Sequence, residues 1–541
     1  MRGVWTSGQV REAEEVLLAR TPEGALMRRA AFGLAVRARR MLARSGGQQV
    51  ALLVGAGNNG GDALWAGYEL RRRGIAVTAV LLDPQRAHPA GLAALRRAGG
   101  RVVAADGPGA GGGRGEGGGP GEARERRERE DLAPVRAVRA GVAGAGVAGA
   151  GVAGAGGPGA AAGVLRRADL VVDGIVGISG RGPLRERAAT LVAAVTAPIL
   201  AVDLPSGVDP DTGAVDGPAV TATETVTFGA LKPVHVLAAA RCGPVHLVDI
   251  GLAPHLPTPH AEVLEAADVG ARWPVPGPAD DKYTQGVTGI AAGSATYPGA
   301  AVLATGAAVL ATSGMVRFAG SAADGVRAAW PEVIATDSIA AAGQTQAWTV
   351  GPGSGTGDDG AALLAAVLEH DVPACVDADA ITVLGTHPAL RERIRGREIL
   401  LTPHDREFAR VAGEVGPDRI AAARHAAAQL GVTVLLKGNA TVVADPDGRA
   451  LVHPSATSWA ATAGSGDVLS GIVGALLAAG LGPWWAGGCA TYLHGVAAAL
   501  AADGAPAPAS AIQHAIPAAI RRVRRADGVH PVHDVTTWTK R

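Results

Sequence analysis

Residues 462–471 read Thr-Ala-Gly-Ser-Gly-Asp-Val-Leu-Ser-Gly, a glycine-rich turn followed by an apolar run with helical spacing. Free N–H groups at the start of such a helix, together with the helix dipole, form an anion site. Asp467 lies at this position, where a carboxylate would repel a phosphate unless it does chemical work, such as accepting a proton from a hydroxyl. Alternatively, Asp467 only caps the helix, and these ten residues leave both hypotheses open.

Composition narrows the class of protein. A chain of 541 residues is long enough for two or three domains, and with 3% aromatic residues its cores must be aliphatic. A net charge of +1 argues against nucleic acid or an anionic membrane surface as a partner. The three cysteines are far apart in the sequence and no long apolar segment opens the chain, so we expect a cytoplasmic protein without a disulfide framework.

The N-terminal half shows strands alternating with helices, which predicts a parallel, doubly wound α/β sheet. Ligands of such a sheet bind at the carboxyl ends of its strands. One or two amphipathic helices are expected between residues 8 and 44. The expected strands are 49–57, 75–83, 170–176 and 198–203, with helices at 63–73 and 91–98.

A connector rich in Pro and Ala, at residues 255–278, predicts a second α/β domain, so we expect domains at 1–258 and 262–535. Its candidate strands are 289–293, 347–350, 374–377, 399–402 and 432–436, and Asp445-Pro-Asp-Gly448 predicts a hairpin. Within the first domain, residues 106–163 are Gly-rich, then highly charged, and contain three tandem copies of Gly-Val-Ala-Gly-Ala. That composition predicts a disordered insertion.

Polar residues follow three strands of the first domain. Gly55-Ala-Gly-Asn-Asn-Gly-Gly-Asp62 opens a helix, Asp173 precedes a second glycine-rich loop, and Val202-Asp-Leu-Pro-Ser-Gly207 ends a third strand. Because parallel strand ends converge, Asn59, Asp173 and Ser206 would offer oxygen ligands to a monovalent cation or a sugar hydroxyl. Asp203 would then be a candidate base, with Lys232 near enough to tune it. Each residue taken alone could instead be a turn or cap residue.

Together, these motifs and Phe228-Gly-Ala-Leu-Lys-Pro233 resemble the NAD(P)H-hydrate epimerase domain, a Rossmann-like family that interconverts R and S hydrated nicotinamide nucleotides and binds K⁺. The resemblance implies that Asp203 moves protons beside Lys232. It implies K⁺ ligands at Asn59, Asp173 and Ser206. The implied substrate contacts are Asn58, Asn59, Gly60, Gly61, Asp62, Gly177, Ile178, Ser179, Gly180, Arg181, Gly182, Pro183 and Asp203.

The C-terminal half contains further polar strand ends. Gly351-Pro-Gly-Ser-Gly355 is a second glycine-rich turn, and His404 in Leu-Thr-Pro-His ends another strand. Leu436-Lys-Gly-Asn-Ala-Thr441 contains a lysine and a hydroxyl four residues apart, which suits phosphate oxygens. Of the 50 Lys and Arg residues only four are lysines, so a lysine inside a motif indicates a need for its compact ammonium, although codon bias is an alternative explanation.

These motifs, with Tyr297-Pro-Gly-Ala-Ala301, Asp377-Ala-Asp-Ala380 and Tyr492-Leu-His-Gly495, resemble the ADP-dependent NAD(P)H-hydrate dehydratases, a branch of the ribokinase-like superfamily. The resemblance spans residues 265–525. It implies ADP contacts at Lys437, Gly438, Asn439, Ala440, Thr441 and Gly466. It implies hydrate contacts at Ala300, Gly353 or Gly355, His404 and Asp467. In the mechanism that we expect, a Mg²⁺ would help to neutralise the phosphates.

Both resemblances point to one damaged cofactor. We expect the first domain to interconvert the hydrate epimers (NADHX and NADPHX), and the second to dehydrate the S form while ADP yields AMP and phosphate. Asp467 would deprotonate the ring hydroxyl, and phosphorylation would turn that hydroxyl into a good leaving group. Two alternatives remain, a ribokinase-like small-molecule kinase fused to a nucleotide-binding domain and a non-catalytic scaffold. A homo-oligomer is compatible with the sequence, although no interface can be read from it.

Overall fold

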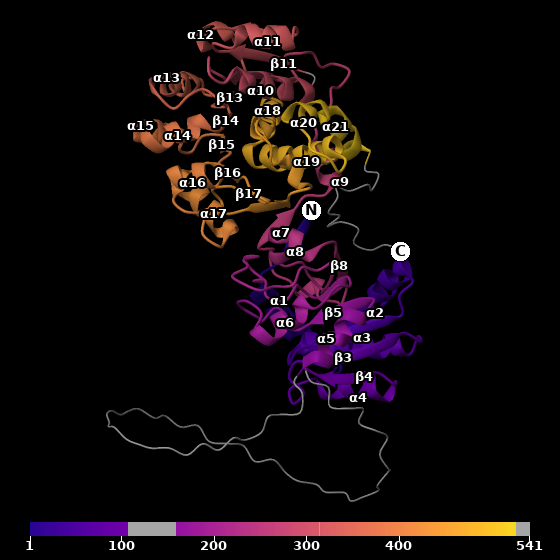
Figure 1. The fold of residues 1–541 in the computed structure, drawn as a ribbon. Helices are drawn as coiled ribbons and strands as arrows, with labels where there is room; N and C mark the ends of the chain where they lie inside the picture. Colours follow the sequence, from indigo (N-terminus) through magenta and orange to yellow (C-terminus); the bar gives the residue numbers. More distant parts are fainter. Residues whose placement is uncertain (106–157, 313, 526–541) are drawn as a thin grey trace, which may run out of the picture.

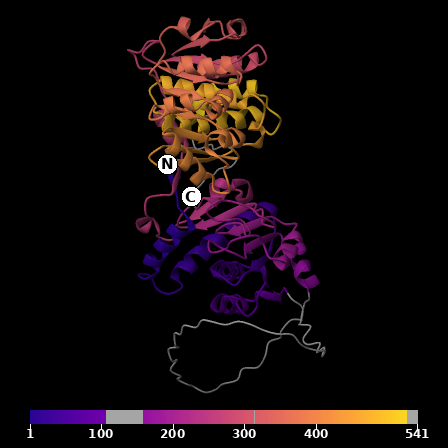
Figure 2. The ribbon, with the colours of Figure 1, turned by 90° about the vertical axis from the view of Figure 1, so that its left-hand side faces the viewer.

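The computed structural model describes residues 1–105, 158–312 and 314–525, which form two α/β lobes (Figure 1; Figure 2). The lower lobe in Figure 1 carries the N-terminal half in indigo and magenta, and the upper lobe carries the C-terminal half in orange and yellow. Most of the predicted insertion lies outside the described residues, including all three tandem repeats. Its predicted end at residue 163 needs correction, because helix α5 begins at Pro158.

The N-terminal lobe is built on a seven-stranded sheet in which all neighbouring strands are parallel. The central strands are largely apolar and buried on both faces, as expected when helices cover a parallel sheet on both sides, with Asp173 in β5 as a buried exception. In spatial order the strands are β4 (Arg101–Ala104), β3 (Ala76–Leu81), β2 (Gln49–Val54), β5 (Leu170–Gly174), β6 (Ile199–Val202), β7 (Glu224–Phe228) and β8 (Val245–Val248). The chain reverses its direction across the sheet between β2 and β5, and such a switch point opens a crevice at the strand ends.

Helices pack on both faces of this sheet and leave that crevice open. Helices α1, α2 and α3 contribute to one apolar core, and α5 and α6 contribute to a second core. The helices of this lobe are α1 (Ser7–Leu18), α2 (Ala25–Ser45), α3 (Asn58–Arg71), α4 (Pro89–Arg97), α5 (Pro158–Arg167), α6 (Glu186–Ala193), α7 (Val234–Leu237) and α8 (Ala239–Cys242). Helix α3 starts five residues earlier than expected, so the Asn-Asn-Gly-Gly-Asp motif forms its first turn.

The C-terminal lobe is built on an eleven-stranded mixed sheet. Its strands, in spatial order, are β1 (Arg2–Val4), β9 (Ala261–Val263), β18 (Ala450–Pro454), β17 (Ala440–Ala444), β16 (Thr433–Leu436), β15 (Ile399–Leu401), β14 (Ala374–Val376), β13 (Ala347–Val350), β10 (Val287–Ala291), β11 (Met315–Ala319) and β12 (Ile334–Thr336). The predicted hairpin is confirmed, because β17 and β18 pair antiparallel. A second switch point lies between β10 and β13.

Helices cover both faces of this sheet, with α13–α17 on one side and α10 and α18–α21 on the other (Figure 1). Helix α18 is buried almost all round, which explains its nearly continuous apolar sequence. The helices are η1 (Ala253–His255), α9 (Ala266–Arg272), α10 (Pro298–Ala311), α11 (Ala323–Ala329), α12 (Ile339–Ala342), α13 (Asp358–Val367), α14 (Asp379–Thr386), α15 (Pro388–Ile394), α16 (Asp405–Ala412), α17 (Arg419–Leu430), η2 (Ser458–Ala460), α18 (Ser465–Ala478), α19 (Pro483–Ala502), α20 (Ala509–His514) and α21 (Ile516–Arg524). In the described ranges, no helix is both long enough and apolar enough to cross a membrane.

One continuous apolar core contains residues of both lobes, and one strand from the N-terminal half joins the sheet of the C-terminal lobe. Val234 and Val236 of α7 belong to the same buried cluster as Val452 of β18. Strand β1, at the start of the chain, pairs antiparallel with β9 and so lies at the edge of the C-terminal sheet. The expected domain at 1–258 therefore differs from the structure at its first residues, which join the other lobe.

Candidate active sites

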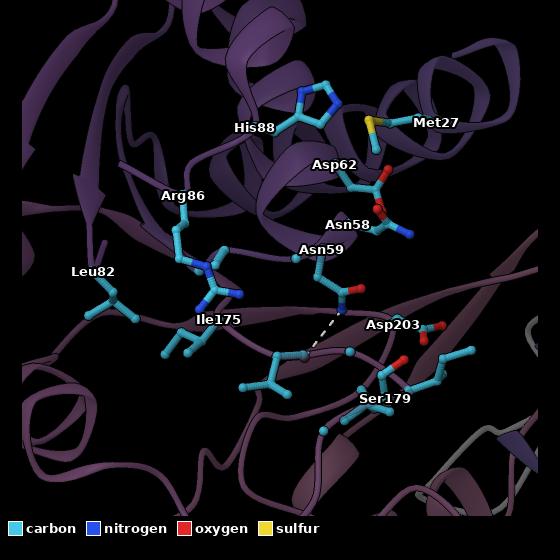
Figure 3. A pocket seen from close by; sticks show the side chains of 18 of the residues that line it. Met27, Asn58, Asn59, Asp62, Leu82, Arg86, His88, Ile175, Ser179 and Asp203 are labelled. Atoms are coloured by element: carbon cyan, nitrogen blue, oxygen red, sulfur yellow. Dashed lines mark hydrogen bonds between the residues drawn. The ribbon is translucent and has the colours of Figure 1, made fainter. Parts of the chain in front are cut away.

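An open cavity of about 1880 Å³ lies at the switch point of the N-terminal lobe. Its lining includes Asn58, Asn59, Asp62 and Asp203, and Figure 3 shows Asn59 between the Asn58 and Asp62 side chains above it and Asp203 to its lower right. The second glycine-rich loop also lines it, with Gly177, Ile178, Ser179, Gly180, Arg181, Gly182 and Pro183. The convergence of these strand ends, which the sequence predicted, is therefore present in the structure.

The first turn of α3 forms one wall of this cavity. Its N-cap is Gly57, which has no side chain to occupy the free N–H groups of the turn. Gly60 and Gly61 do not line the cavity in the described structure. A Cβ on Gly60 would lie 2.2 Å from the carbonyl oxygen of Gly55, so this glycine allows close packing of the turn.

Asp203 and Lys232 form a buried ion pair beside the cavity. The Lys232 ammonium lies 2.5 Å from Asp203 Oδ1, and Thr227 Oγ1 donates to the same oxygen at 2.9 Å. Burial opposes ionisation of Asp203, but the Lys232 charge and hydrogen bond, together with smaller contributions from His235 and Thr227, outweigh it and lower the pKa of this carboxyl, so Asp203 is a carboxylate. Lys232 is 1% exposed and is absent from the cavity lining, so it acts on Asp203 and not on a bound molecule.

Two further carboxyl groups face the same cavity. Burial, with the nearby charges of Asp203 and Glu14, raises the pKa of Asp62 well above its usual range. Burial also raises the pKa of Glu14, which reaches the cavity from α1. The cavity therefore combines a carboxylate at Asp203 with a carboxyl at Asp62 that holds its proton more tightly than an ordinary aspartic acid, a pairing suited to acid–base chemistry.

Asn59 lines the cavity, and Asp173 and Ser206 lie behind it. Ser206 Oγ donates to Asp173 Oδ1 at 2.7 Å, and Asn59 Nδ2 donates to the carbonyl oxygen of Val202 at 2.6 Å and to that of Val176 at 3.3 Å. Asp173 is completely buried, and burial raises its pKa to about 6 although Ser206 hydrogen bonds oppose this. No Lys or Arg of the described residues pairs with Asp173. A buried carboxylate among neutral oxygens fits a monovalent cation.

The second site lies where α18 begins in the C-terminal lobe. The N-cap of α18 is Gly464, with φ of 82°, and Asp467 is the third residue of the helix. The hypothesis that Asp467 is only an N-cap is therefore wrong. Burial, reinforced by Asp377 and partly offset by Lys437, raises the pKa of Asp467 to about 7.

Lys437 lies beside the α18 turn. A Cβ on Gly466 would be 3.5 Å from Lys437 Nζ, so the predicted proximity of these two residues is present. The ammonium contacts Asp377 Oδ1 at 2.7 Å, and Ser470 Oγ donates to the other oxygen of Asp377. Burial disfavours both charges of the Lys437–Asp377 pair, yet their attraction lowers the pKa of Asp377 and raises that of Lys437.

The other predicted nucleotide contacts lie next to Lys437. Gly438 and Asn439 form the turn between β16 and β17, and Ala440 is buried at the start of β17. Thr441 is half-buried and lines a small cavity with His453 and Thr491.

His404 has a structural role that the sequence did not indicate. It is the N-cap of α16, where its Nδ1 accepts the N–H groups of Arg406 and Glu407 at 3.1 and 3.2 Å. Its side chain is still 50% exposed, so it remains accessible to a ligand. Glu407 Oε2 also lies 3.7 Å from Lys437 Nζ, which connects His404 to the Lys437 site.

The remaining predicted hydrate contacts lie at the switch point between β10 and β13. A Cβ on Gly353, with φ of 60°, would meet the side chains of Ala300 and Tyr297 at 2.9 Å. The Gly355 N–H donates to Asp379 Oδ2 at 2.9 Å. The structure thus brings Gly353 and Ala300 together at the start of α10.

Sequence reasoning missed several side chains. Glu14 stands in an amphipathic helix with nothing local to distinguish it from its acidic neighbours. Arg86 and His88, which line the N-terminal cavity, follow β3 and could have been suspected because they come after a strand end. Asp377 also ends a strand, but its pairing with Lys437 depends on tertiary structure.

Two known protein families match this chain, one in each half of the sequence. Residues 23–115 and 144–234 match the family described as YjeF-related protein N-terminus, and residues 288–519 match the family described as NAD(P)H-hydrate dehydratase. A bifunctional NAD(P)H-hydrate repair enzyme of Mycobacterium tuberculosis is 52% identical over 493 residues, covering 89% of this chain and 90% of that protein. The chain belongs to the family of bifunctional NAD(P)H-hydrate repair enzymes.

Two more relatives agree with this membership. The bifunctional NAD(P)H-hydrate repair enzyme of Mycobacterium leprae is 51% identical over 515 residues, covering 94% of this chain and 96% of that protein. An ADP-dependent (S)-NAD(P)H-hydrate dehydratase of Neisseria meningitidis is 41% identical over 256 residues, covering 45% of this chain and 86% of that protein. The expected family of bifunctional repair enzymes is confirmed, and the kinase and scaffold alternatives are set aside.

Proposed function

We propose that this repair enzyme restores hydrated NADH and NADPH in two steps, one in each lobe. The N-terminal lobe interconverts the R and S hydrates, and the C-terminal lobe dehydrates the S form while ADP is converted to AMP and phosphate. The observation that carries the proposal is the placement of Asp467, a carboxyl with a pKa of about 7, at an uncapped helix N-terminus beside Lys437. A carboxyl with that pKa suits proton abstraction near neutral pH.

In the N-terminal lobe, Asp203 and Asp62 supply the two protonation states that epimerisation requires. Asp203, kept ionised by Lys232, accepts a proton from the hydrate, and Asp62 donates one. The dinucleotide has a pyrophosphate, and the cavity offers it the α3 N–H groups and several guanidinium groups. The arginines that line the cavity are Arg11, Arg28, Arg86, Arg181, Arg185 and Arg187.

The proposed K⁺ ligands are Asn59, Asp173 and Ser206. When bound, K⁺ neutralises the buried Asp173 carboxylate. Asn59 also lines the cavity, so the cation would fix the α3 turn against the loop at Val176. The chain's own contribution is to hold the turn that carries Asn58 and Asp62 in place.

In the C-terminal lobe, Asp467 removes the proton of the ring hydroxyl of the hydrate. At the same time, that hydroxyl oxygen attacks the terminal phosphate of the nucleotide. The new O–P bond forms while the bond between the terminal phosphate and AMP breaks, so AMP leaves. The ring C–O bond then breaks to release phosphate, and the neighbouring ring carbon loses a proton to the departing phosphate, which restores the dihydropyridine ring. The proposed nucleotide contacts are Lys437, Gly438, Asn439, Ala440, Thr441 and Gly466, and the proposed hydrate contacts are Ala300, Gly353 or Gly355, His404 and Asp467. Lys437 and the N–H groups of α18 hold the phosphate charge.

We propose that Mg²⁺ enters with the nucleotide phosphates. Within the described residues, no group of three His, Cys, Asp or Glu side chains could hold a metal. Mg²⁺ usually binds through substrate phosphates and water with few protein ligands, so this donor set fits a metal–nucleotide complex. The metal neutralises phosphate charge. We also assign the protein to the cytoplasm, since its three cysteines are free and buried.

Asp467→Asn and Asp203→Asn test the proposal and serve as controls for one another. Asp467→Asn should abolish recovery of reduced-nicotinamide absorbance from the S hydrate with ADP, but leave R-to-S conversion intact. Asp203→Asn should do the opposite, with conversion of the pure R hydrate followed chromatographically in the absence of ADP. Retention of both activities in either variant would refute the assigned role.

A further inference from the structure

A buried histidine ties together the backbones of the two ion-paired residues of the epimerisation site. His235 is in α7, three residues after Lys232, and is completely buried. The backbone N–H of Lys232 donates to His235 Nδ1 at 3.0 Å, and His235 Nε2 lies 2.8 Å from the carbonyl oxygen of Asp203. One imidazole ring therefore bridges both residues through main-chain atoms.

The chemistry of its partners fixes the state of this ring. A backbone N–H can only donate and a carbonyl can only accept, so Nδ1 is unprotonated and Nε2 carries the hydrogen. Burial, together with the Lys232 charge, lowers the pKa of His235 to about 4, so the ring is neutral near physiological pH. Both of its nitrogens are used, which leaves neither for proton transfer to a substrate.

Asp203 needs support at this point of its backbone. Its φ is +68°, in the left-handed region that a residue with a side chain rarely adopts. Its N–H donates to the carbonyl of Val226 at 2.7 Å, and its own carbonyl accepts from His235. This backbone conformation directs the side chain of Asp203 into the cavity lining and toward Lys232.

We propose that His235 is a positioning residue for epimerisation, which holds Asp203 in its left-handed conformation and fixes Lys232 at ion-pairing distance. The inference rests on the proposed catalytic role of Asp203. His235 does not line the cavity, so it acts only through the two residues that it bridges. Loss of the bridge should misplace the Asp203 carboxylate without removing the surface that binds the hydrate.

Three substitutions in the full-length protein separate the two hydrogen bonds. In His235→Gln, the amide Nε2 can still donate to the Asp203 carbonyl. In His235→Asn, the amide Oδ1 can still accept from the Lys232 N–H but cannot reach Asp203. His235→Leu keeps neither bond. Each variant is assayed for kcat and KM of R-to-S conversion without ADP, and for S-hydrate dehydration with ADP in the same preparation.

We expect kcat for epimerisation to fall about 10- to 100-fold in His235→Leu and His235→Asn, since a misplacement of about 1 Å has such an effect, with KM nearly unchanged. His235→Gln should recover most of kcat, and dehydration should be unaffected in all three. A wild-type kcat in His235→Leu, equal losses in the Gln and Asn variants, or parallel loss of dehydration and thermal stability would overturn the positioning role. Asp203→Asn distinguishes the two failures, because its full activity would instead refute the catalytic role of Asp203.

Discussion

Asp467→Asn should inactivate dehydration and also stabilise the protein at alkaline pH. The Asp467 carboxyl has a pKa of about 7 in the folded protein, mainly because burial opposes its ionisation, against a usual value of 3.8. Its ionisation therefore costs more in the folded state than in the unfolded chain. A functional carboxylate that destabilises its own fold is expected at an active site, where activity is retained at the expense of stability.

The magnitude and its sign follow from that pKa difference. Below about pH 4 the Asp467 carboxyl is protonated in both states, so it contributes nothing to the pH dependence of the free energy of unfolding. Between about pH 4 and 7 it ionises only in the unfolded chain. The destabilisation therefore grows with pH and is complete above 7. The shift from 3.8 to about 7 sets an upper bound of about 4 kcal/mol, and partial exposure reduces the expected gain to about 1–2 kcal/mol.

Denaturant unfolding of the wild type and Asp467→Asn at pH 4.5 and pH 8 measures this difference. The variant should be more stable at pH 8 by about 1–2 kcal/mol and nearly equal to the wild type at about pH 4.5. In parallel, the wild-type dehydration rate should rise about tenfold between about pH 6 and pH 8 as Asp467 ionises. A variant that is less stable at both pH values, or a wild-type rate that is flat across this range, would refute the reasoning.

Three other perturbations test separate parts of the structure. Asp173→Asn should slow epimerisation and remove its dependence on K⁺, measured by KCl titration at constant ionic strength, and an unchanged titration curve would contradict the cation site. Gly60→Ala should destabilise the N-terminal lobe by about 1–3 kcal/mol, because the new Cβ meets a backbone carbonyl at 2.2 Å. A Cβ at Gly57 has no neighbouring atom within 4 Å, so Gly57→Ala is the matched control and should leave thermal unfolding unchanged. Burial of the Glu224 carboxyl would raise its pKa, but the hydrogen bonds from His246 and Arg37 outweigh this effect. They lower the pKa of Glu224 from 4.5 to about 2. Its ion pair should add about 2–3 kcal/mol of stability above about pH 4.5 that is lost as the pH falls toward 2, so Glu224→Gln should be less stable than the wild type at pH 7 and equal to it near pH 2.

The sequence predicted elements whose signal is local. Strands β2, β5 and β13 are apolar runs that end at glycine-rich turns, and such runs require burial whatever the rest of the chain does. Strand β7 was missed because it begins with Glu224. That charge is buried only because Arg37 and Arg44 of α2 neutralise it from far away in the sequence.

The residues of the candidate sites likewise fall into those that local sequence signals predict and those that depend on tertiary packing. Asn59, Asp173 and Ser206 could be grouped from sequence because each lies at or just beyond the end of a parallel strand, and the ends of such strands meet at one edge. Glu14 could not, since the orientation of α1 over the cavity depends on packing between α1, α2 and the sheet. The N-cap explanation of Asp467 was settled only by the observed helix start.

The pairing of β1 with β9 affects the order in which this protein can be completed during synthesis. Residues 2–4 leave the ribosome before the rest of the N-terminal lobe, but their partner strand β9 follows that whole lobe. The nascent lobe must therefore fold with the β9-facing edge of β1 unpaired and with apolar side chains of α7 still uncovered, both of which invite aggregation. A fragment that ends before residue 261 would keep this liability permanently, so separating the two activities requires polar replacements on α7 and on the edge of β1 that faces β9.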